Sequence, residues 1–167
     1  MILGHGDIAS VLAPYDKKWT LFFASGVSNS QETRDSEYQR EIELLNNYAL
    51  QGWHIVYFSS MSVFYSNSRY AIHKKAMEWR VKALFPHYTI IRLGNITWGT
   101  NPHTIINFFK GQKERGETPV LQDTYRYIVT LEEFLYWIGM IPGFSCEMNI
   151  PGERMTVKEV WERYVEC

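Results

Sequence analysis

Short apolar runs alternate with amphipathic stretches along this chain, and the alternation predicts strands separated by helices. Apolar, β-prone runs predict strands at residues 1–3, 19–24, 54–58 and 88–93. The run from His54 to Phe58 has no polar alternation, which is typical of a parallel strand covered on both faces. Helices should therefore pack on both sides of the sheet.

The clearest helix is predicted over residues 35–51. Its apolar positions recur at three- and four-residue intervals, at Tyr38, Ile42, Leu45 and Ala49. This spacing places them on one helix face. Gly52 follows where a helix C-cap is expected.

Capping and terminating residues mark the other helices. After the first strand, a short apolar helical stub is closed by Pro14. Ser68 caps a helix that runs to about Phe85. Further helices are predicted near residues 104–110, 130–138 and 156–166. Capping boxes open the last two, pairing Thr130 with Glu133 and Thr156 with Glu159.

Alternating strands and helices predict one α/β domain with a mainly parallel sheet flanked by helices. In such sheets, ligands bind beyond the carboxyl ends of the strands. The glycine turn after residue 3 and the serines after residue 58 both fall at such ends.

Composition narrows the classes of partner. Among 167 residues, 46% are hydrophobic, and 17 basic against 18 acidic side chains give a formal net charge of -1. Interspersed charges argue against nucleic acid or an anionic membrane as the partner. No segment has the roughly eighteen consecutive apolar residues of a membrane span. We therefore expect a cytoplasmic protein with a small-molecule partner.

The cysteines and histidines predict neither a disulfide framework nor a metal site. Cys146 and Cys167 lie far apart and outside any CxxC motif. The 5 histidines show no HxxH or HExxH spacing. Free thiols in a cytosol are the simplest interpretation.

A glycine turn, Gly4-x-Gly6-x-x-Ala9, follows the first strand. Such a turn lets the backbone approach a pyrophosphate, whose charge exposed N–H groups can hold. The plain alternative is an ordinary tight turn. An acidic partner for ribose hydroxyls, expected about twenty positions further on, has no clear counterpart, because Asp16 comes too early.

Tyr70 and Lys74 form the one Tyr-x-x-x-Lys match in the chain. Residues four apart share a helix face, so the ammonium can lie beneath the phenol ring and favour phenolate. The match opens a helix just after a strand that ends in Ser59-Ser60. A surface tyrosine with a solvated lysine is the alternative.

Ser59, Ser60 and Ser62 compete for the role of a hydrogen-bond donor to a substrate carbonyl. Ser60 is the preferred candidate. The alternative is that all three hydroxyls only satisfy backbone groups in a turn.

These segments resemble the extended short-chain dehydrogenase/reductase family, the epimerases, dehydratases and ketoreductases of nucleotide sugars, over nearly the whole chain. The glycine turn resembles the family's phosphate loop, and Leu21 to Gly26 resembles its strand ending in small residues beside the cofactor. The resemblance implies that the chain binds NAD or NADP. It implies these cofactor-binding residues: Gly4, Gly6, Asp7, Ile8, Ala24, Ser25, Gly26 and Lys74.

The resemblance also implies the catalytic and substrate-binding residues. Phe58 to Phe64 is similar to the segment with the catalytic serine, so Ser60 would act with Tyr70 and Lys74 in proton and hydride transfer on a nucleotide sugar. Arg92 to Gly99 resembles the family's Arg-x-x-Asn segment. Asn95 would be the substrate-binding residue of that segment, and Tyr125 to Ile128 resembles the segment whose arginine contacts the nucleotide-sugar diphosphate. The substrate-binding candidates are therefore Ser62, Asn95 and Arg126.

The chain departs from the family pattern between its first two strands. About half a dozen residues near 14–18 stand where the family places two more strands with their helices. The resemblance therefore implies a reduced Rossmann-like domain over 1–167, lacking the adenosine-side strands, with 100–167 as a small α/β extension and substrate-side lobe. Ser60 and Tyr70 are also closer in sequence than is usual for the family.

Three hypotheses follow. The first is an NAD(P)-dependent nucleotide-sugar epimerase, dehydratase or ketoreductase. The second is a reduced, non-catalytic relative that binds a nucleotide sugar or a protein partner. The third is a dimeric scaffold, because in the family the helices matching 35–51 and 68–85 pair across a two-fold axis.

Overall fold

The computed structural model describes residues 1–166 and is built on a five-stranded sheet. The strands are all parallel, in the order β1-β2-β3-β4-β7. They are β1 (Ile2–Leu3), β2 (Thr20–Phe23), β3 (His54–Ser60), β4 (His87–Leu93) and β7 (Cys146–Ile150). The prediction of a mainly parallel α/β sheet flanked by helices is confirmed.

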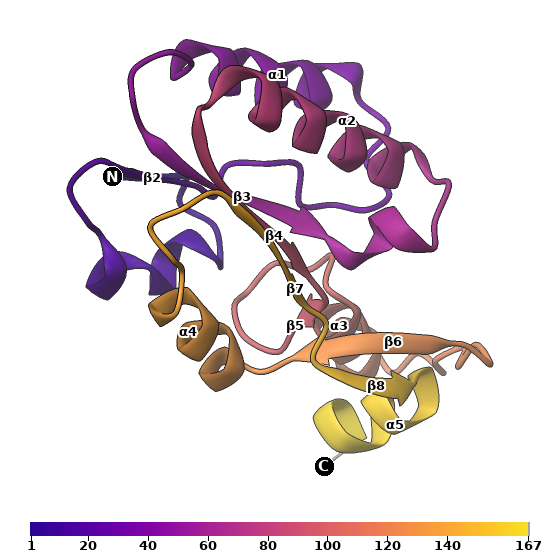
Figure 1. Cartoon of the computed structure of the whole chain (residues 1–167). Helices are drawn as coiled ribbons and strands as arrows, with labels where there is room; N and C mark the ends of the chain where they lie inside the picture. Colours follow the sequence, from indigo (N-terminus) through magenta and orange to yellow (C-terminus); the bar gives the residue numbers. More distant parts are fainter. Residues whose placement is uncertain (167) are drawn as a thin grey trace.

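Helices cover both faces of this sheet, as Figure 1 shows. Helices α1 (Asp35–Asn47) and α2 (Arg69–Leu84) lie side by side on one face. Helix α4 (Leu131–Gly139) covers the other face together with two 3₁₀ turns, η1 (Ala9–Val11) and η2 (Ala13–Tyr15). The sheet therefore has a core on each side.

The middle of β3, residues 55–58, is apolar at every position. Ile55 and Tyr57 pack into the core beneath α1 and α2. Val56 and Phe58 point the other way, into the core that α4 closes. Because successive side chains of a strand face opposite sides, a strand buried on both faces needs apolar residues at every position.

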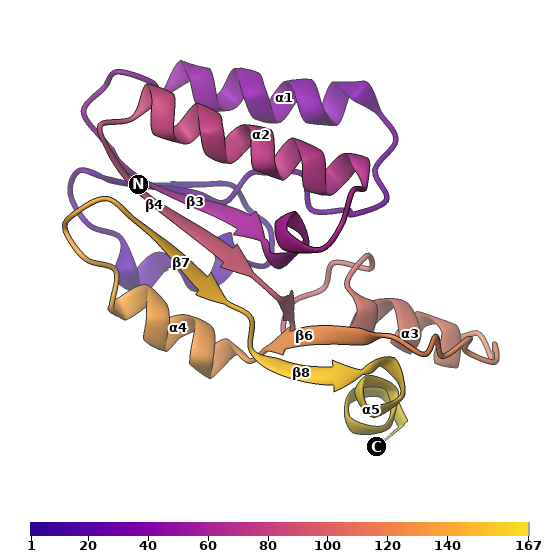
Figure 2. The same cartoon turned by 45° about the vertical axis from the view of Figure 1, so that its right-hand side comes forward.

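A second, three-stranded sheet lies beyond the carboxyl ends of the first (Figure 2). Its order is β5 (Asn95–Ile96), β6 (Tyr125–Val129) and β8 (Glu153–Thr156), with β5 and β6 parallel and β6 and β8 antiparallel. Helices α3 (Ile105–Glu114) and α5 (Val157–Trp161) pack beside it, and a π-helical turn (Glu162–Glu166) follows α5.

Some helix ends and caps differ from the sequence-based expectations, and α3 runs to Glu114 where the sequence predicts an end near residue 110. Helix α1 ends at Asn47, because Leu50 and Gly52 take left-handed φ angles of 61° and 75° that no α-helix continues. The stub near Pro14 forms only 3₁₀ turns, since proline cannot donate the bond that would extend a helix. Both hydrogen bonds of the capping box form at Thr156. At Thr130, the structure shows the bond in which the threonine side chain accepts the Glu133 N–H.

Two further findings concern expectations from composition. Within residues 1–166, every helix is too short or too polar to cross a membrane. Cys146 is a reduced thiol and is not part of a disulfide. Cys167 lies outside the described residues.

The core between α4 and the first sheet can be tested by a substitution at Phe134. It is fully buried on α4 and packs against Phe58 and Trp98. Replacing it with alanine should lower the free energy of unfolding by about 3–5 kcal/mol, because the cavity adds to the lost burial. Urea unfolding measures this loss. As the matched control, Tyr136 on the same helix is 61% exposed, and Tyr136→Ala should change the stability by less than about 0.5 kcal/mol.

Candidate functional site

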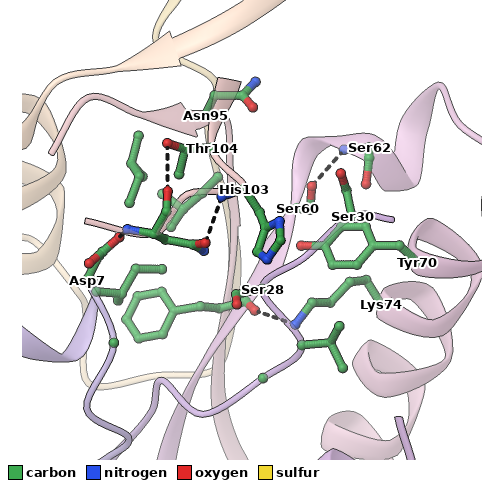
Figure 3. A pocket seen from close by; sticks show the side chains of 18 of the residues that line it. Asp7, Ser28, Ser30, Ser60, Ser62, Tyr70, Lys74, Asn95, His103 and Thr104 are labelled. Atoms are coloured by element: carbon green, nitrogen blue, oxygen red, sulfur yellow. Dashed lines mark hydrogen bonds between the residues drawn. The ribbon is translucent and has the colours of Figure 1, made fainter. Parts of the chain in front are cut away.

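A cleft of about 720 Å³ opens at the carboxyl ends of the parallel strands, between the two sheets. It is lined by the turn after β1, the ends of β2, β3 and β4, the start of α2, and the loop before α3. This is where ligands bind in parallel α/β sheets. Figure 3 shows Ser60 and Tyr70 on one side of the cleft and Asp7 on the other, with the His103 ring between them, close to Tyr70 in this view.

The glycine turn is held tightly at one of its two glycines. Gly4 has a φ of 121°, and a Cβ there would lie 2.3 Å from the carbonyl oxygen of Ala24. Gly4 therefore lets the turn pack against the end of β2. At Gly6 a Cβ would meet no atom within 4 Å, so the turn leaves open space where Gly6 lines the cleft.

Asp7 ties the glycine turn to the loop after β5. Its carboxylate accepts the backbone N–H groups of Thr100 and Asn101 at 2.9 and 3.0 Å. Its carbonyl oxygen accepts the indole N–H of Trp98 at 3.1 Å. Gly99 makes room for the carboxylate, since a Cβ there would lie 2.0 Å from Asp7 Cγ. Asp7 thus forms a fixed wall of the cleft.

The three serines after β3 have different surroundings. Ser59 is buried and its hydroxyl donates to Glu78 Oε1 at 2.6 Å. Ser60 lines the cleft, and its Oγ accepts the Ser62 N–H as the N-cap of a 3₁₀ turn, η3 (Met61–Phe64). Its hydroxyl proton therefore stays available to a ligand. Ser62 Oγ is buried and has no hydrogen-bond partner within residues 1–166.

Tyr70 and Lys74 lie in the first two turns of α2, whose N-terminus is capped by Ser68. Lys74 Nζ lies 5.8 Å from the centre of the Tyr70 ring. Both residues line the cleft, and Tyr70 is partly exposed there. Ser60, Tyr70 and Lys74 are therefore brought together at one wall.

Lys74 is also half of a buried ion pair. Its side chain is 3% exposed, and Nζ lies 3.1 Å from Glu41 Oε1 on α1, whose side chain is fully buried. The ammonium also donates to the Tyr57 hydroxyl at 3.3 Å and to the Phe58 carbonyl at 3.4 Å. An ammonium has three donors, so each has a protein acceptor.

Glu41 is the centre of this cluster. Besides Lys74, it accepts hydrogen bonds from the Val27 N–H at 2.8 Å and the Tyr57 hydroxyl at 2.6 Å. His73 Nε2 lies 2.9 Å from its second oxygen. Because an ionised carboxylate only accepts, we assign the proton of the His73 imidazole to Nε2.

Burial and charge act in opposite directions on the ionisation of the pair. Burial alone would raise the pKa of Glu41, but the Lys74 ammonium and the hydrogen bonds from His73, Tyr57 and Val27 hold this pKa well below 4.5. Burial would lower the pKa of Lys74, but the Glu41 carboxylate raises it. Burial, and then Glu41, raise the pKa of Tyr57. The pair is therefore ionised at neutral pH.

Gly26 lies directly against the ion pair. A Cβ at this position would be 2.5 Å from Lys74 Nζ and 2.8 Å from Glu41 Oε1. The small residue after β2 therefore makes room for the buried charges as well as lining the cleft.

The predicted cofactor residues fall into two groups. Gly6, Asp7, Ile8, Ala24, Gly26 and Lys74 line the cleft. Gly4 and Ser25 lie outside this lining. Gly4 packs against β2, while the backbone and hydroxyl oxygens of Ser25 accept hydrogen bonds from Arg40.

The predicted substrate residues Ser62, Asn95 and Arg126 all line the cleft. The Asn95 amide donates to the Tyr127 carbonyl at 3.1 Å, which fixes β5 against β6. Arg126 donates to Thr124 Oγ1 and to the Tyr125 carbonyl at 3.0 and 2.9 Å. Arg126 thus brings a positive charge to the second-sheet side of the cleft.

Sequence reasoning missed Glu41, Tyr57 and His73 around Lys74, and His103 in the cleft. Glu41 lies between Tyr38 and Leu45 on the buried stripe of α1, and a charged residue in an apolar stripe is a signal of a buried partner. His103 follows no recognisable motif. Within residues 1–166, no group of three His, Cys, Asp or Glu side chains is arranged to hold a metal ion.

The comparisons with known proteins identify the fold. No known family matches the sequence, and no curated protein matches it. A solved structure that it resembles is the Bordetella bronchiseptica enzyme WbmG in complex with NAD and UDP, with a TM-score of 0.66, 16% identity, and coverage of 86% of this chain and 55% of that one.

Two further structures resemble it similarly. The UDP-glucose 4-epimerase of Thermotoga maritima with UDP-glucose has a TM-score of 0.64 and 18% identity, covering 86% of this chain and 59% of that one. The dTDP-4-dehydrorhamnose reductase of Bacillus anthracis with NADP has a TM-score of 0.63 and 18% identity, covering 86% and 61%. The chain thus has the fold of these enzymes and spans little more than half their length.

Glu41→Gln tests the ion pair. The variant keeps the side-chain shape but leaves the Lys74 charge buried without its partner, so the free energy of unfolding should fall by about 3 kcal/mol or more. Adding Lys74→Met should recover part of the loss, because it removes the unpaired charge. Glu43→Gln is the control: Glu43 is exposed on the same helix, and its loss should cost less than about 0.5 kcal/mol.

The stability difference between wild type and Glu41→Gln should depend on pH, because folding lowers the pKa of Glu41. The pKa of Glu41 is lowered on folding, so its contribution is complete above its usual value of 4.5 and declines as the pH falls below that. The stability gap between wild type and Glu41→Gln should therefore narrow in acid. A gap that widens below pH 4.5 would contradict a buried ionised Glu41.

Proposed function

We propose that the chain is an NAD(P)-dependent protein of the nucleotide-sugar epimerase, dehydratase or ketoreductase type. The observation that carries the proposal is the meeting of Ser60, Tyr70 and Lys74 at one wall of a cleft at the strand ends. The likeness to NAD- and NADP-bound structures named for UDP and dTDP sugars supports this class. Substrate, reaction and residue roles are part of the proposal.

The cleft fits the nicotinamide-bearing half of the cofactor. Gly6 leaves open space for a phosphate, and Ser60 and Tyr70 line the cleft beyond it. The longest hydrogen bond of Lys74, at 3.4 Å to the Phe58 carbonyl, is the one that a ribose hydroxyl would replace. When bound, NAD(P) would accept or supply the hydride.

The residues have separate roles in the proposed reaction. As an alcohol is oxidised to a ketone, the Tyr70 side chain takes the hydroxyl proton, and in reduction the phenol returns it. The Ser60 hydroxyl, whose oxygen already accepts the Ser62 N–H, donates to the sugar oxygen. Asn95 and Ser62 position the sugar, and Arg126 holds the diphosphate of the nucleotide sugar. Within residues 100–167, α3, β6, β8 and α5 would form the substrate-side lobe, whereas α4 and β7 belong to the layers of the first sheet.

One observation favours the second hypothesis, a non-catalytic relative that binds a nucleotide sugar or a protein partner. The segment between β1 and β2 consists of turns, so β1 lies at the edge of the sheet. This arrangement supports a shortened form without the strands that would hold adenosine. Calorimetric binding of a UDP sugar with no response to NADH or NADPH would favour this alternative.

Tyr70→Phe tests the proposed enzyme. The substitution removes only the hydroxyl, so the fold should be retained while turnover falls by at least about 100-fold, as expected for loss of a proton-transfer group. Turnover is followed by NADH or NADPH absorbance with UDP- and dTDP-linked keto sugars. Tyr136→Phe, at an exposed position of α4, is the control. Unchanged turnover in Tyr70→Phe would refute the assignment.

A homodimer through α1 and α2 is the proposed assembly. Ile72 and Trp79 are exposed two turns apart on α2, and such an apolar stripe is typical of helix pairing. Trp79, which is 71% exposed, would be buried in the dimer. Trp79→Glu should therefore convert a dimer to a monomer in light scattering, whereas Met140→Glu, at the end of α4, should not. A monomeric wild type would contradict this assembly.

A further inference from the structure

The cleft extends from β1 in one direction only. Its lining begins at the turn of residues 5–8 and continues across the ends of β2, β3 and β4 to Arg126 on β6. In the sheet order β1-β2-β3-β4-β7, all of these strand ends lie on the same side of β1. The glycine turn is therefore one end of the cleft.

The path of the chain after β1 explains why the cleft ends at the glycine turn. After β1, residues 4–19 pass through η1 and η2 and enter β2, which pairs directly with β1. In a doubly wound sheet, each half of the strands receives one mononucleotide, on either side of the crevice. Here the described strands form only the half that carries Ser60 and the start of α2.

Of the two acidic residues in this connection, Asp16 lies away from the cleft. Asp16 pairs with the N-terminal ammonium of Met1. It lines a separate hollow with Trp19 and Trp53, which flank the amino ends of β2 and β3. Because parallel strands have all their carboxyl ends at the opposite edge, Asp16 cannot meet a ribose bound over Gly6.

The carboxylate of Asp7, at the turn, is also held by protein groups. Both oxygens of its carboxylate accept backbone N–H groups of the loop at Thr100 and Asn101. A ribose hydroxyl needs a carboxylate with free acceptor positions directed at it. Asp7 is directed into the wall instead.

We infer that the cleft holds only the nicotinamide mononucleotide half of the dinucleotide, and that the adenosine half stays in solvent. This inference rests on the proposed function and specifies which part of the cofactor the chain recognises. Adenosine should therefore add little to the affinity, because a group that stays in solvent makes no contacts to offset the entropic cost of ordering it.

Calorimetric titration tests this inference with NADH, reduced nicotinamide mononucleotide and AMP. The two reduced compounds should bind within about tenfold of each other, and AMP should not compete with either. A preference for NADH of more than about 100-fold, or competition by AMP, would overturn the inference while leaving the proposed function intact. Failure of both reduced compounds to bind would overturn the two together.

A pair of glycine variants locates the binding. A Cβ at Gly6 or at Gly143 meets no atom within 4 Å, so either alanine should leave the fold intact. Gly6 lines the cleft, whereas Gly143 lies in the loop after α4. Gly6→Ala should weaken both reduced compounds by the same factor, about tenfold if the methyl group displaces the phosphate. Gly143→Ala should leave both unchanged. A loss confined to NADH would contradict the inference.

Discussion

The buried ion pair of Glu41 and Lys74 is the constraint on which the site depends. Burying two opposite charges is favourable only with good geometry and with partners for the remaining donors and acceptors. Here the pair itself joins α1 to α2, and the further partners come from α2, β3 and the segment after β2. The position of Lys74 beneath Tyr70 therefore depends on the packing of both helices against the sheet, and Gly26 is required by the space the charges occupy.

The opposite wall is built on another part of the molecule. Asp7 holds the glycine turn to the loop after β5, and that strand belongs to the second sheet. A ligand that spans the cleft would thus contact the strand ends and the start of α2 on one side and the second sheet on the other. Because Glu41 balances the charge of Lys74, Arg126 carries the positive charge toward which an anionic part of the ligand would orient.

Elements with strong local patterns were predictable from sequence, and long-range pairings were not. Uninterrupted apolar residues identified β3, and Ser68 and Thr156 marked helix starts at the correct residues. Strand β5 has two residues, too few for any periodicity to appear. Glu41 could be noticed as a charge on an apolar stripe, but Lys74 lies 33 positions away, and no local pattern links the two.

Cofactor binding and the ion pair are compatible, because the contacts of Lys74 differ in length. The Glu41 oxygen lies at 3.1 Å, while the Phe58 carbonyl lies at 3.4 Å, where a hydrogen bond is weak. A ribose hydroxyl can take the place of the carbonyl while the charge pair stays intact. Exchanging the Glu41 contact instead would leave a buried carboxylate without its cation, at a cost that one ribose hydrogen bond does not offset. Lys74 would therefore meet a ligand through the donor that now contacts the Phe58 carbonyl, and further polar contacts would come from hydroxyl groups that line the cleft, those of Ser60 and Tyr70 among them.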